Sequence, residues 1–325
     1  MRPFTRLATA CLLAITTTVV ASASEAPDPP KRLGFFESIA AYRDMVEKVE
    51  VTRDVEYAEG DGMKLTLDVV QPKAASASPR PALVFVHGGG WKHGNKRGGI
   101  GRLTPFVARG DYVGFSVGYR LSGVAKWPAQ IYDCKAAIRW IRKNAGKYNV
   151  DPNKIGVWGV SAGGHLVSML GTSGGVESLE GNGGWPEMSS RVTCVVNFCG
   201  PSDFLAFGVH SPRMNKPGGP VYDLFGGPLK EKVEAAKEAS PVTHASKDDA
   251  PILIMHGTKD GVVPVDQAKR LHNALSEAGA DSTLVTVEGG GHIFGGYQVT
   301  ERVTYFFAKH LRGTQVEVSD QPIEK

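Results

Sequence analysis

Six apolar runs of strand length, separated by helical patterns, constrain the fold of this chain more than any other feature. Their length and their content of β-branched residues are those of strands buried in a parallel sheet. Strands that alternate with helices in this way predict one parallel sheet covered on both faces, an α/β architecture. The runs cover residues 82–86, 112–117, 155–158, 192–198, 252–255 and 283–287, and the helical patterns cover residues 129–146, 162–171, 265–279 and 298–311.

The N-terminus has the three parts of a secretory signal peptide. Arg2 and Arg6 form a positive region, residues 7–20 form an apolar stretch, and a small-x-small cleavage site ends at Ala23. The apolar stretch is shorter than the ~20 residues that a membrane span needs, which disfavours a membrane anchor. Cys11 has too little apolar sequence before it for a lipoprotein signal. We therefore expect cleavage near Ala23 and a secreted or periplasmic protein without a membrane anchor.

Several segments do not follow the alternation of strands and helices. Residues 51–57 and 63–70 predict an antiparallel pair joined by a turn, after a short helix near residues 37–48. Residues 171–190 and 204–240, rich in Gly and Pro, predict small cap insertions that form a lid or a substrate wall. We expect a signal peptide over 1–23, a lead-in with a short helix over 24–50, a catalytic domain over 51–312 and a disordered tail over 313–325.

Charge and cysteine content narrow the class of partner. The net charge of +4 falls to +2 when Arg2 and Arg6 leave with the signal peptide, because 35 basic residues then face 33 acidic ones. No basic run indicates a nucleic-acid partner. Cys134, Cys194 and Cys199 remain after cleavage, and we expect them to be small buried residues without a structural disulfide.

The motif Gly-x-Ser-x-Gly occurs three times, around Ser116, Ser161 and Ser173. Only Ser161 lies between a predicted strand and a predicted helix, where a tight turn projects the hydroxyl above the sheet. The helix N-terminus that follows favours developing negative charge. Ser116 lies inside a strand and Ser173 in a glycine-rich loop, so we interpret both as structural residues. Ser161 is therefore the predicted nucleophile.

A serine hydroxyl needs a general base, and the base needs an orienting acid. His292 lies on a glycine loop after the last predicted strand, and Asp260 follows the strand before it. The order Ser161, Asp260, His292 is the chain order of α/β-hydrolases. Asp260 could instead cap a turn and His292 could be an ordinary loop histidine, but three suitable residues in order favour a triad. Asp203, after the preceding strand, is the alternative acid.

A run of His-Gly-Gly-Gly-Trp that ends at Trp91 directly follows a predicted strand. Its glycines let the main chain approach a substrate closely, which predicts an oxyanion hole built from the N–H groups of Gly89, Gly90 and Ala162. A phosphate loop is excluded, because Asn-Lys follows Gly94 in place of the required Lys-Ser/Thr.

Two tryptophans are candidates for the substrate site. Trp91, beside the oxyanion loop, and Trp185 can each form a wall for an acyl group or a sugar, and ordinary packing is the alternative for both. His87 and His165 are expected to hold the oxyanion loop and the nucleophile turn. No cluster of His, Cys, Asp and Glu has the spacing of metal ligands, so we expect neither a metal nor a cofactor.

With these motifs, the chain resembles the alpha/beta-hydrolase esterase and lipase superfamily, particularly its bacterial feruloyl and acetyl xylan esterase-like (BD-FAE type) branch. The resemblance covers about residues 50–312. Val160 stands where hormone-sensitive-lipase relatives carry Asp, which argues against that branch. The motifs that carry the resemblance are His87-Gly-Gly-Gly-Trp91, Gly159-Val-Ser-Ala-Gly-Gly-His165, His256-Gly-Thr-Lys-Asp260 and Gly291-His292.

The resemblance implies an α/β-hydrolase fold and a carboxylesterase that acts through Ser161, His292 and Asp260. Export and the resemblance together lead us to expect acetyl or feruloyl esters, carried by small molecules or plant polysaccharides, as substrates. The superfamily also contains kynurenine formamidase-like amidases and peptidases, so an amidase on the same triad is an alternative. A non-catalytic binding protein of this fold is a second alternative, and the intact triad argues against it.

Overall fold

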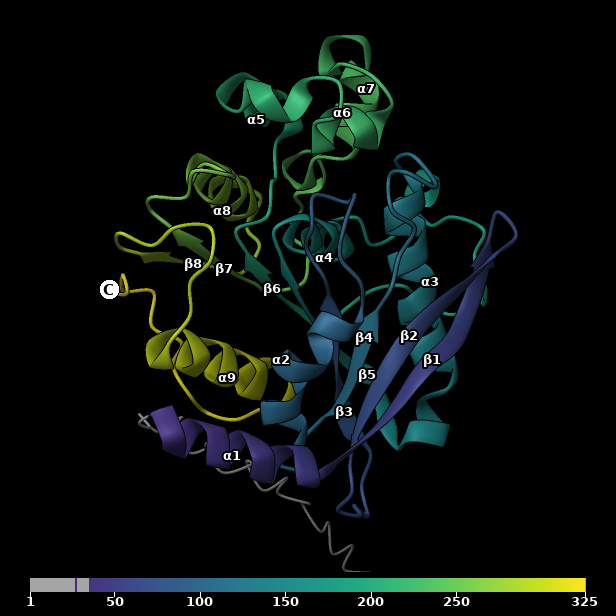
Figure 1. The fold of residues 1–325 in the computed structure, drawn as a ribbon, viewed down its shortest axis with the longest axis vertical. Coiled ribbons are helices and arrows are strands. Elements are labelled where there is room, and N and C mark those ends of the chain that lie inside the picture. Colours follow the sequence, from purple (N-terminus) through teal and green to yellow (C-terminus); the bar gives the residue numbers. More distant parts are fainter. Residues whose placement is uncertain (1–26, 28–34, 325) are drawn as a thin grey trace, which may run out of the picture.

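The computed structural model describes residue 27 and residues 35–324. Within them the strands form one eight-stranded sheet in the order β1-β2-β4-β3-β5-β6-β7-β8 (Figure 1). β1 and β2 form an antiparallel pair, β2 also runs antiparallel to β4, and every later pair is parallel, as predicted. The strands are β1 (Val49–Gly60), β2 (Met63–Pro72), β3 (Arg80–Val86), β4 (Val113–Val117), β5 (Val150–Val160), β6 (Cys194–Phe198), β7 (Ile252–Gly257) and β8 (Ser282–Val287).

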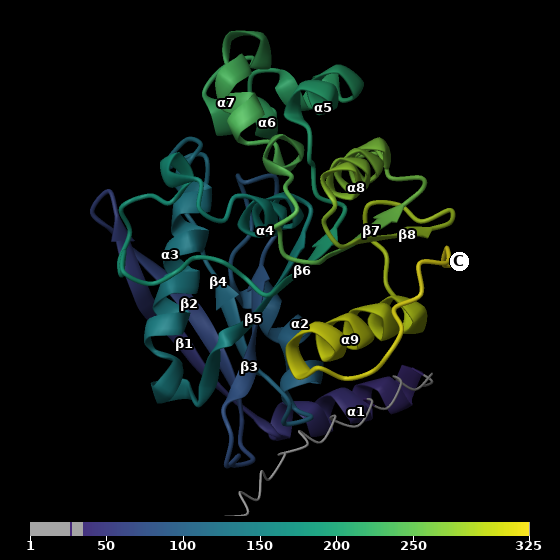
Figure 2. The same ribbon diagram turned by 180° about the vertical axis from the view of Figure 1, so that it is seen from behind.

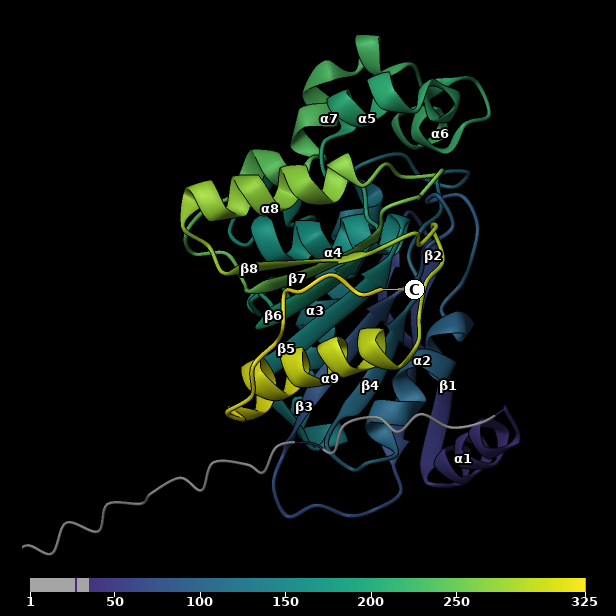
Figure 3. The same ribbon diagram turned by 90° about the vertical axis from the view of Figure 1, so that its left-hand side faces the viewer.

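Helices cover both faces of the sheet. In Figure 3, α3, α4 and α8 lie on one side, and α2 and α9 lie on the other with α1 beyond them. The described helices outside the cap are α1 (Phe35–Glu47), α2 (Arg97–Val107), α3 (Ala129–Lys143), α4 (Ala162–Thr172), α8 (Asp266–Ala278) and α9 (Tyr297–Arg312). The predicted α/β layers are therefore confirmed.

The apolar core is split by the sheet into two clusters. Along β3, Val84 packs in the cluster under α3 and α4, whereas its neighbours Leu83 and Phe85 pack in the cluster under α2 and α9. Successive side chains of a strand point to opposite faces, so a strand between two helical layers must be apolar at every position. This explains why the central strands appear in the sequence as continuous apolar runs.

Helix α2 was not predicted from the sequence. It contains three glycines and Pro105, which are poor helix formers. Its packing explains one of them, because a Cβ on Gly99 would lie 2.1 Å from Ser116 Oγ in β4. The glycine allows the helix to approach the sheet closely, at the expense of the local helical signal.

The chain after Gly313 differs from the predicted disordered tail. Ile323 pairs with Val287 of β8, and its side chain is only 4% exposed. Two backbone hydrogen bonds hold it there, from the Ile323 amide to the Thr286 carbonyl and from the Glu288 amide to the Ile323 carbonyl. β8 is an edge strand, so its unpaired backbone groups can bind this segment. The polar composition of residues 313–325 gave no indication of this pairing in the sequence.

We call residues 204–240 the cap. Its helices are α5 (Phe204–His210), α6 (Pro220–Phe225) and α7 (Val233–Glu238), and they lie beyond the carboxyl ends of β5 and β6 in opposite views (Figures 1 and 2). None of the helices in the described part of the chain combines the length and apolar character needed to cross a membrane. The predicted signal peptide over 1–23 lies outside the described residues.

Candidate active site

Ser161 lies on the tight turn between β5 and α4. It has a strained backbone with a positive φ (φ +56°, ψ −121°), and its amide donates to the Phe198 carbonyl at 2.7 Å. A Cβ on Gly159 would lie 2.1 Å from the Gly163 carbonyl oxygen, and a Cβ on Gly163 would lie 2.1 Å from the Val86 carbonyl oxygen. Only glycine fits at either position, so the spacing of the motif is a steric requirement of the turn.

A chain of hydrogen bonds joins Ser161 to two residues from later strands. His292 Nε2 lies 3.0 Å from Ser161 Oγ, and His292 Nδ1 lies 2.7 Å from Asp260 Oδ2. Asp260 follows β7 and His292 follows β8, so the carboxyl ends of three parallel strands converge at one edge of the sheet. The structure therefore brings together the three residues predicted as a triad.

The carboxylate of Asp260 is buried and fully hydrogen-bonded. Its Oδ1 accepts from the amides of Val262 (2.8 Å) and Val263 (3.0 Å). Burial by itself would raise the pKa of Asp260, but hydrogen bonds from His256, His292 and these amides outweigh burial and hold the pKa below its usual range. Asp260 therefore stays ionised beside His292.

His256 is a contact that the sequence reasoning missed. Its Nε2 lies 2.8 Å from the Val263 carbonyl oxygen and 3.2 Å from Asp260 Oδ2, and its side chain is fully buried. It therefore braces the loop that carries Asp260. The signal was available, because His256 opens the motif His-Gly-Thr-Lys-Asp, but the spacing alone did not show that the two ends of that motif touch.

The alternative candidates from the sequence have structural roles. Asp203 caps α5 by accepting from the Ala206 amide at 3.0 Å, and Arg270 lies 3.3 Å from its other oxygen. Ser116 is buried in β4, where its hydroxyl donates to the Lys96 carbonyl. Ser173 is buried at the end of α4 and donates to the Met169 carbonyl at 2.6 Å. None of the three candidates contacts His292.

The predicted oxyanion loop lies against the nucleophile turn. A Cβ on Gly88 would lie 3.3 Å from Ser161 Cβ. Gly89 (φ +116°) and Gly90 (φ +60°) have positive φ values, which turn the chain back over the serine. The N–H groups of Gly89, Gly90 and Ala162 have no hydrogen-bond partner among the described residues. Three amides beside the serine hydroxyl are thus free to bind an oxyanion.

Trp91 is among the residues that line the pocket at Ser161, as predicted, but almost none of its surface is exposed. Its side chain is only 2% exposed and packs against Phe204 of the cap. Its Nε1–H donates to His165 Nδ1 at 3.1 Å, and His165 Nε2 in turn donates to the Ala239 carbonyl at 2.7 Å. Burial lowers the pKa of His165 to about 4, so the ring is neutral near pH 7. The two side chains tie the oxyanion loop to the start of α4 and to the cap.

Trp185 lies away from the predicted position. Its ring is 37% exposed and stands 4.9 Å from Lys143 Nζ, near the C-terminal end of α3. It does not line the pocket at Ser161. Trp185 belongs to the 171–190 insertion, whose place in the fold depends on contacts with α3 that no local pattern encodes.

A pocket of about 460 Å³ opens above Ser161 and His292. The oxyanion loop forms one wall, and the cap forms another, as predicted for this insertion. Its wall is mainly apolar although the cap sequence is rich in Gly and polar residues, because the cap's apolar side chains are the ones that face inward. The apolar side chains are Phe207, Met214 and Pro220 of the cap, joined by Val262, Val263 and Ile293 from the loops after β7 and β8.

Cys134, Cys194 and Cys199 are free and buried. Burial, with a smaller contribution from the charge of Asp260, raises the pKa of the Cys199 thiol to about 12. Among the described residues, Cys199, Asp260 and His292 are one group whose potential metal-ligating atoms lie within 4.8 Å of one another. Two of these three residues already bond to each other in the Ser161 chain, which accounts for the cluster without an ion.

The sheet order, the strand-to-helix turn at Ser161 and the convergence of Asp260 and His292 define an α/β-hydrolase. Residues 67–275 match the model of the BD-FAE family. The chain therefore belongs to the BD-FAE family, in agreement with the motifs in its sequence.

Several of the relatives are esterases by name. The chain is 31% identical to Esterase LipC of Mycobacterium tuberculosis over 72% of this chain and 58% of LipC. A truncated carbohydrate esterase from gut microbiota is 34% identical, with a TM-score of 0.74, and the match covers 80% of this chain and 96% of that one. Both relatives are thus similar to this chain over most of its length.

A third relative has been solved in several chemical states. Esterase 2 of the Planctomycetes species Thermogutta terrifontis with propionate bound is 27% identical, with a TM-score of 0.66, over 83% of this chain and 97% of that one. The same esterase phosphorylated by paraoxon is 25% identical, with a TM-score of 0.65, over 88% and 100%. By contrast, this chain spans only between 51% and 58% of the three mycobacterial esterases that it matches.

Proposed function

We propose that the protein is an exported serine carboxylesterase that hydrolyses short acyl esters, acetyl or feruloyl, carried by plant polysaccharides. The observation that carries this proposal is the hydrogen-bonded chain from Ser161 through His292 to Asp260, with distances of 3.0 and 2.7 Å, beside three unpaired backbone amides. Serine, base, acid and oxyanion donors are the parts that acyl transfer requires.

In the acylation step, Ser161 Oγ attacks the ester carbonyl carbon while His292 Nε2 takes the hydroxyl proton. The carbonyl oxygen becomes an oxyanion, which the N–H groups of Gly89, Gly90 and Ala162 bind. The C–O bond to the alcohol then breaks, and His292 returns its proton to the leaving alkoxide. Ionised Asp260 keeps the imidazole oriented and stabilises its positive charge.

Deacylation repeats these steps with water as the nucleophile. His292 takes a proton from water, the hydroxide attacks the acyl-Ser161 carbonyl, and the same amides bind the second oxyanion. Collapse releases the carboxylic acid, and His292 returns the proton to Ser161 Oγ. The products are the acid and the alcohol, so the chain needs no cofactor for this reaction.

Two observations support a short acyl group on a carbohydrate. The pocket above Ser161 has about 460 Å³, enough for a short acyl chain with part of its alcohol. Among the relatives, one is a carbohydrate esterase by name and another has been solved with propionate bound. Trp91 lines this pocket but is almost fully buried, so we assign the chain-length limit to the apolar cap residues Phe207 and Met214.

Replacing the nucleophile tests the proposed activity. Ser161→Ala should lower kcat for p-nitrophenyl acetate by about 10⁴-fold or more, because no other hydroxyl of the described residues forms a hydrogen bond with His292. Ser116→Ala and Ser173→Ala are matched controls from the same motif and should leave turnover within a few-fold. An organophosphate probe should label Ser161 alone. A phosphorylated Ser173, or no labelling of any serine, would contradict the proposal.

A series of acyl chain lengths tests the substrate class. We expect kcat/KM to be highest for acetate or butyrate esters and to fall steeply for octanoate and palmitate, because each misplaced methylene costs about 1–3 kcal/mol. Acetylated xylan and methyl ferulate should also be hydrolysed. An optimum at octanoate or longer argues against a short-acyl enzyme. Activity on small acetates but on neither plant-derived substrate would indicate a general carboxylesterase.

A further inference from the structure

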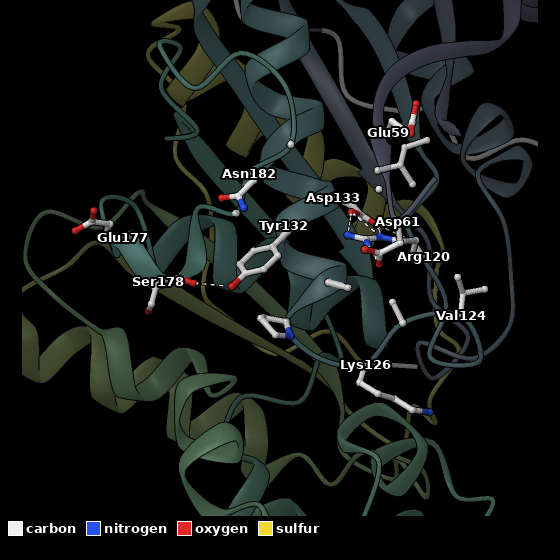
Figure 4. A pocket seen from close by; sticks show the side chains of 17 residues that line it. Glu59, Asp61, Arg120, Val124, Lys126, Tyr132, Asp133, Glu177, Ser178 and Asn182 are labelled. Atoms are coloured by element: carbon white, nitrogen blue, oxygen red, sulfur yellow. Dashed lines mark hydrogen bonds and ion pairs between the residues drawn. The ribbon is translucent and has the colours of Figure 1, made fainter. Parts of the chain in front are cut away.

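A second cavity, of about 760 Å³, lies outside the pocket at Ser161 (Figure 4). We call it the α3 pocket. Its walls are the turn between β1 and β2 at residues 59–61, the 120–128 loop after β4, the first turn of α3, and residues 177–183. It is larger than the pocket above Ser161, and none of the proposed catalytic residues lines it.

The lining of the α3 pocket is mostly polar. The side chains of Glu59, Glu177 and Asn182 are exposed and form no hydrogen bond or ion pair within the described part of the chain. Tyr132 contributes an aromatic ring, and in Figure 4 this ring lies between Ser178 on one side and Arg120 on the other. The cavity thus combines unpaired hydrogen-bonding groups with a half-buried aromatic face.

The floor of the α3 pocket is held in place before any ligand binds. Arg120 donates from its guanidinium to Asp133 Oδ1 at 2.6 Å and to Asp61 Oδ2 at 2.5 Å, and its amide donates to Asp133 Oδ2 at 2.8 Å. Buried Lys135 donates to Glu180 at 2.7 Å and so anchors the 177–183 segment. A preformed site loses little conformational entropy on binding.

The 120–128 loop separates the α3 pocket from the active site. The Ser122 amide donates to the Trp91 carbonyl in the oxyanion loop at 2.7 Å. The ring of Trp127 packs 5.5 Å from that of His165, at the start of α4. Lys126 lines the α3 pocket from the other side of the same loop. One loop therefore lies between the α3 pocket and the two residues, Trp91 and His165, that hold the oxyanion loop.

The chemistry of the walls selects a neutral polyhydroxylated ligand. The lining contains four carboxylates and two cationic side chains, which disfavours binding of an anionic ligand. One of the two cations, Arg120, is already neutralised by two of these carboxylates. A metal ion is disfavoured as well, because Asp61 and Asp133 are engaged by that guanidinium. Sugar hydroxyls can donate to Glu59 and Glu177 and accept from Asn182, while a sugar face packs on Tyr132.

We propose that the α3 pocket binds sugar units of the polysaccharide whose ester groups Ser161 attacks. This proposal rests on the proposed esterase function and specifies how a polymeric substrate is held. It predicts that the two pockets act together on a polymer and that small esters use only one of them.

The double variant Glu177→Ala/Asn182→Ala tests this proposal, because both side chains are exposed and support no other contact. We expect kcat/KM for acetylated xylan to fall about tenfold, which corresponds to about 1.4 kcal/mol, while kcat/KM for p-nitrophenyl acetate stays within twofold. Calorimetric titration with xylohexaose should show the same loss of affinity. The control is Asn273→Ala/Glu277→Ala, the same residue types on the exposed face of α8, which should change none of these values.

Three results separate this inference from the proposed function. Equal affinity of variant and wild type for xylohexaose, with equal kcat/KM on acetylated xylan, overturns the α3 pocket and leaves the esterase intact. Hydrolysis of p-nitrophenyl acetate without any binding of xylohexaose by the wild type also overturns the pocket. If p-nitrophenyl acetate is not hydrolysed, the esterase proposal fails, and the xylohexaose titration still decides the pocket.

Discussion

At the scale of single residues, the loop that carries Asp260 is held more firmly than a surface turn needs. The carboxylate receives hydrogen bonds from the amides of Val262 and Val263 and from His292, and His256 lies 3.2 Å away. A buried carboxylate needs this many donors to remain ionised. The geometry therefore separates Asp260 from Asp203, which the sequence had left as the alternative acid.

The two acids are distinguished by matched substitutions. Asp260→Asn should lower kcat about 10⁴-fold, by analogy with serine proteases, because an amide neither stabilises the imidazolium nor keeps the correct ring tautomer. Asp203→Asn should lower kcat less than about tenfold, since Asp203 only caps α5 and pairs with Arg270. Kinetics on p-nitrophenyl acetate, with folding checked by circular dichroism, measures both. If Asp203→Asn loses most of its activity and Asp260→Asn does not, Asp203 is the acid of the triad and the assignment of Asp260 is wrong.

His165 makes folding stability depend on pH. Its pKa falls from 6.5 to about 4 on burial. Between these two values the unfolded chain binds a proton that the folded chain does not, so the stability that His165 supports is present above pH 6.5 and is lost as the pH falls toward 4. The shift corresponds to about 3 kcal/mol over that window.

His165→Gln isolates this contribution, because Gln keeps one donor for the Ala239 carbonyl and one acceptor for Trp91 but does not titrate. Urea unfolding at a series of pH values should show a weaker loss of stability below pH 6.5 in the variant than in the wild type. Parallel pH profiles for the two proteins would show that His165 titrates normally in the folded state.

At the scale of elements, the C-terminal segment completes the edge of the sheet next to the loop that carries His292. Ile323→Ala should lower the free energy of unfolding by about 2 kcal/mol, because the side chain is buried against β8 and α9. Denaturant unfolding gives the value. Glu324→Ala, the exposed neighbour, is the control and should have no measurable effect. If Ile323→Ala leaves the free energy of unfolding unchanged, the C-terminal segment is not packed against the sheet in solution.

Elements also differ in how visible they are in the sequence. Strands β3 and β7 were evident, because burial on both faces requires an unbroken apolar run. Helix α2 was hidden, because its three glycines, one of which packs closely on β4, lower its helical propensity. The short cap helices α5 to α7 were not resolved as helices either, since six or seven residues carry too little periodicity.

At the scale of the whole molecule, export and the state of the thiols can be tested together. The secreted protein should begin near Ser24 by N-terminal sequencing, and it should have lost Cys11 with the signal peptide. Cys134, Cys194 and Cys199 are buried, and burial raises the pKa of each thiol, so all three should react with a thiol reagent only after unfolding. Retention of Met1, or one reactive thiol in the unfolded chain, would contradict these expectations.

The sequence by itself determined the class of fold and the three residues that meet at its edge. Parallel strands must end at one edge, so Ser161, Asp260 and His292, each just after a strand, could be placed together before any coordinates. The roles of Gly159 and Gly163 beside Ser161 could also be predicted from the sequence, because the turn has no room for a Cβ at either position. These features follow from local geometry and from burial, which leave a periodic trace in the chain.

Only the tertiary structure decided which surfaces face a substrate. It buried Trp91 under the cap, placed Trp185 over Lys143, and paired Ile323 with β8. The α3 pocket likewise joins segments that are more than a hundred residues apart, from Glu59 to Asn182. Such arrangements depend on contacts between distant segments with irregular backbones, and these contacts leave no periodic pattern in the sequence of either partner.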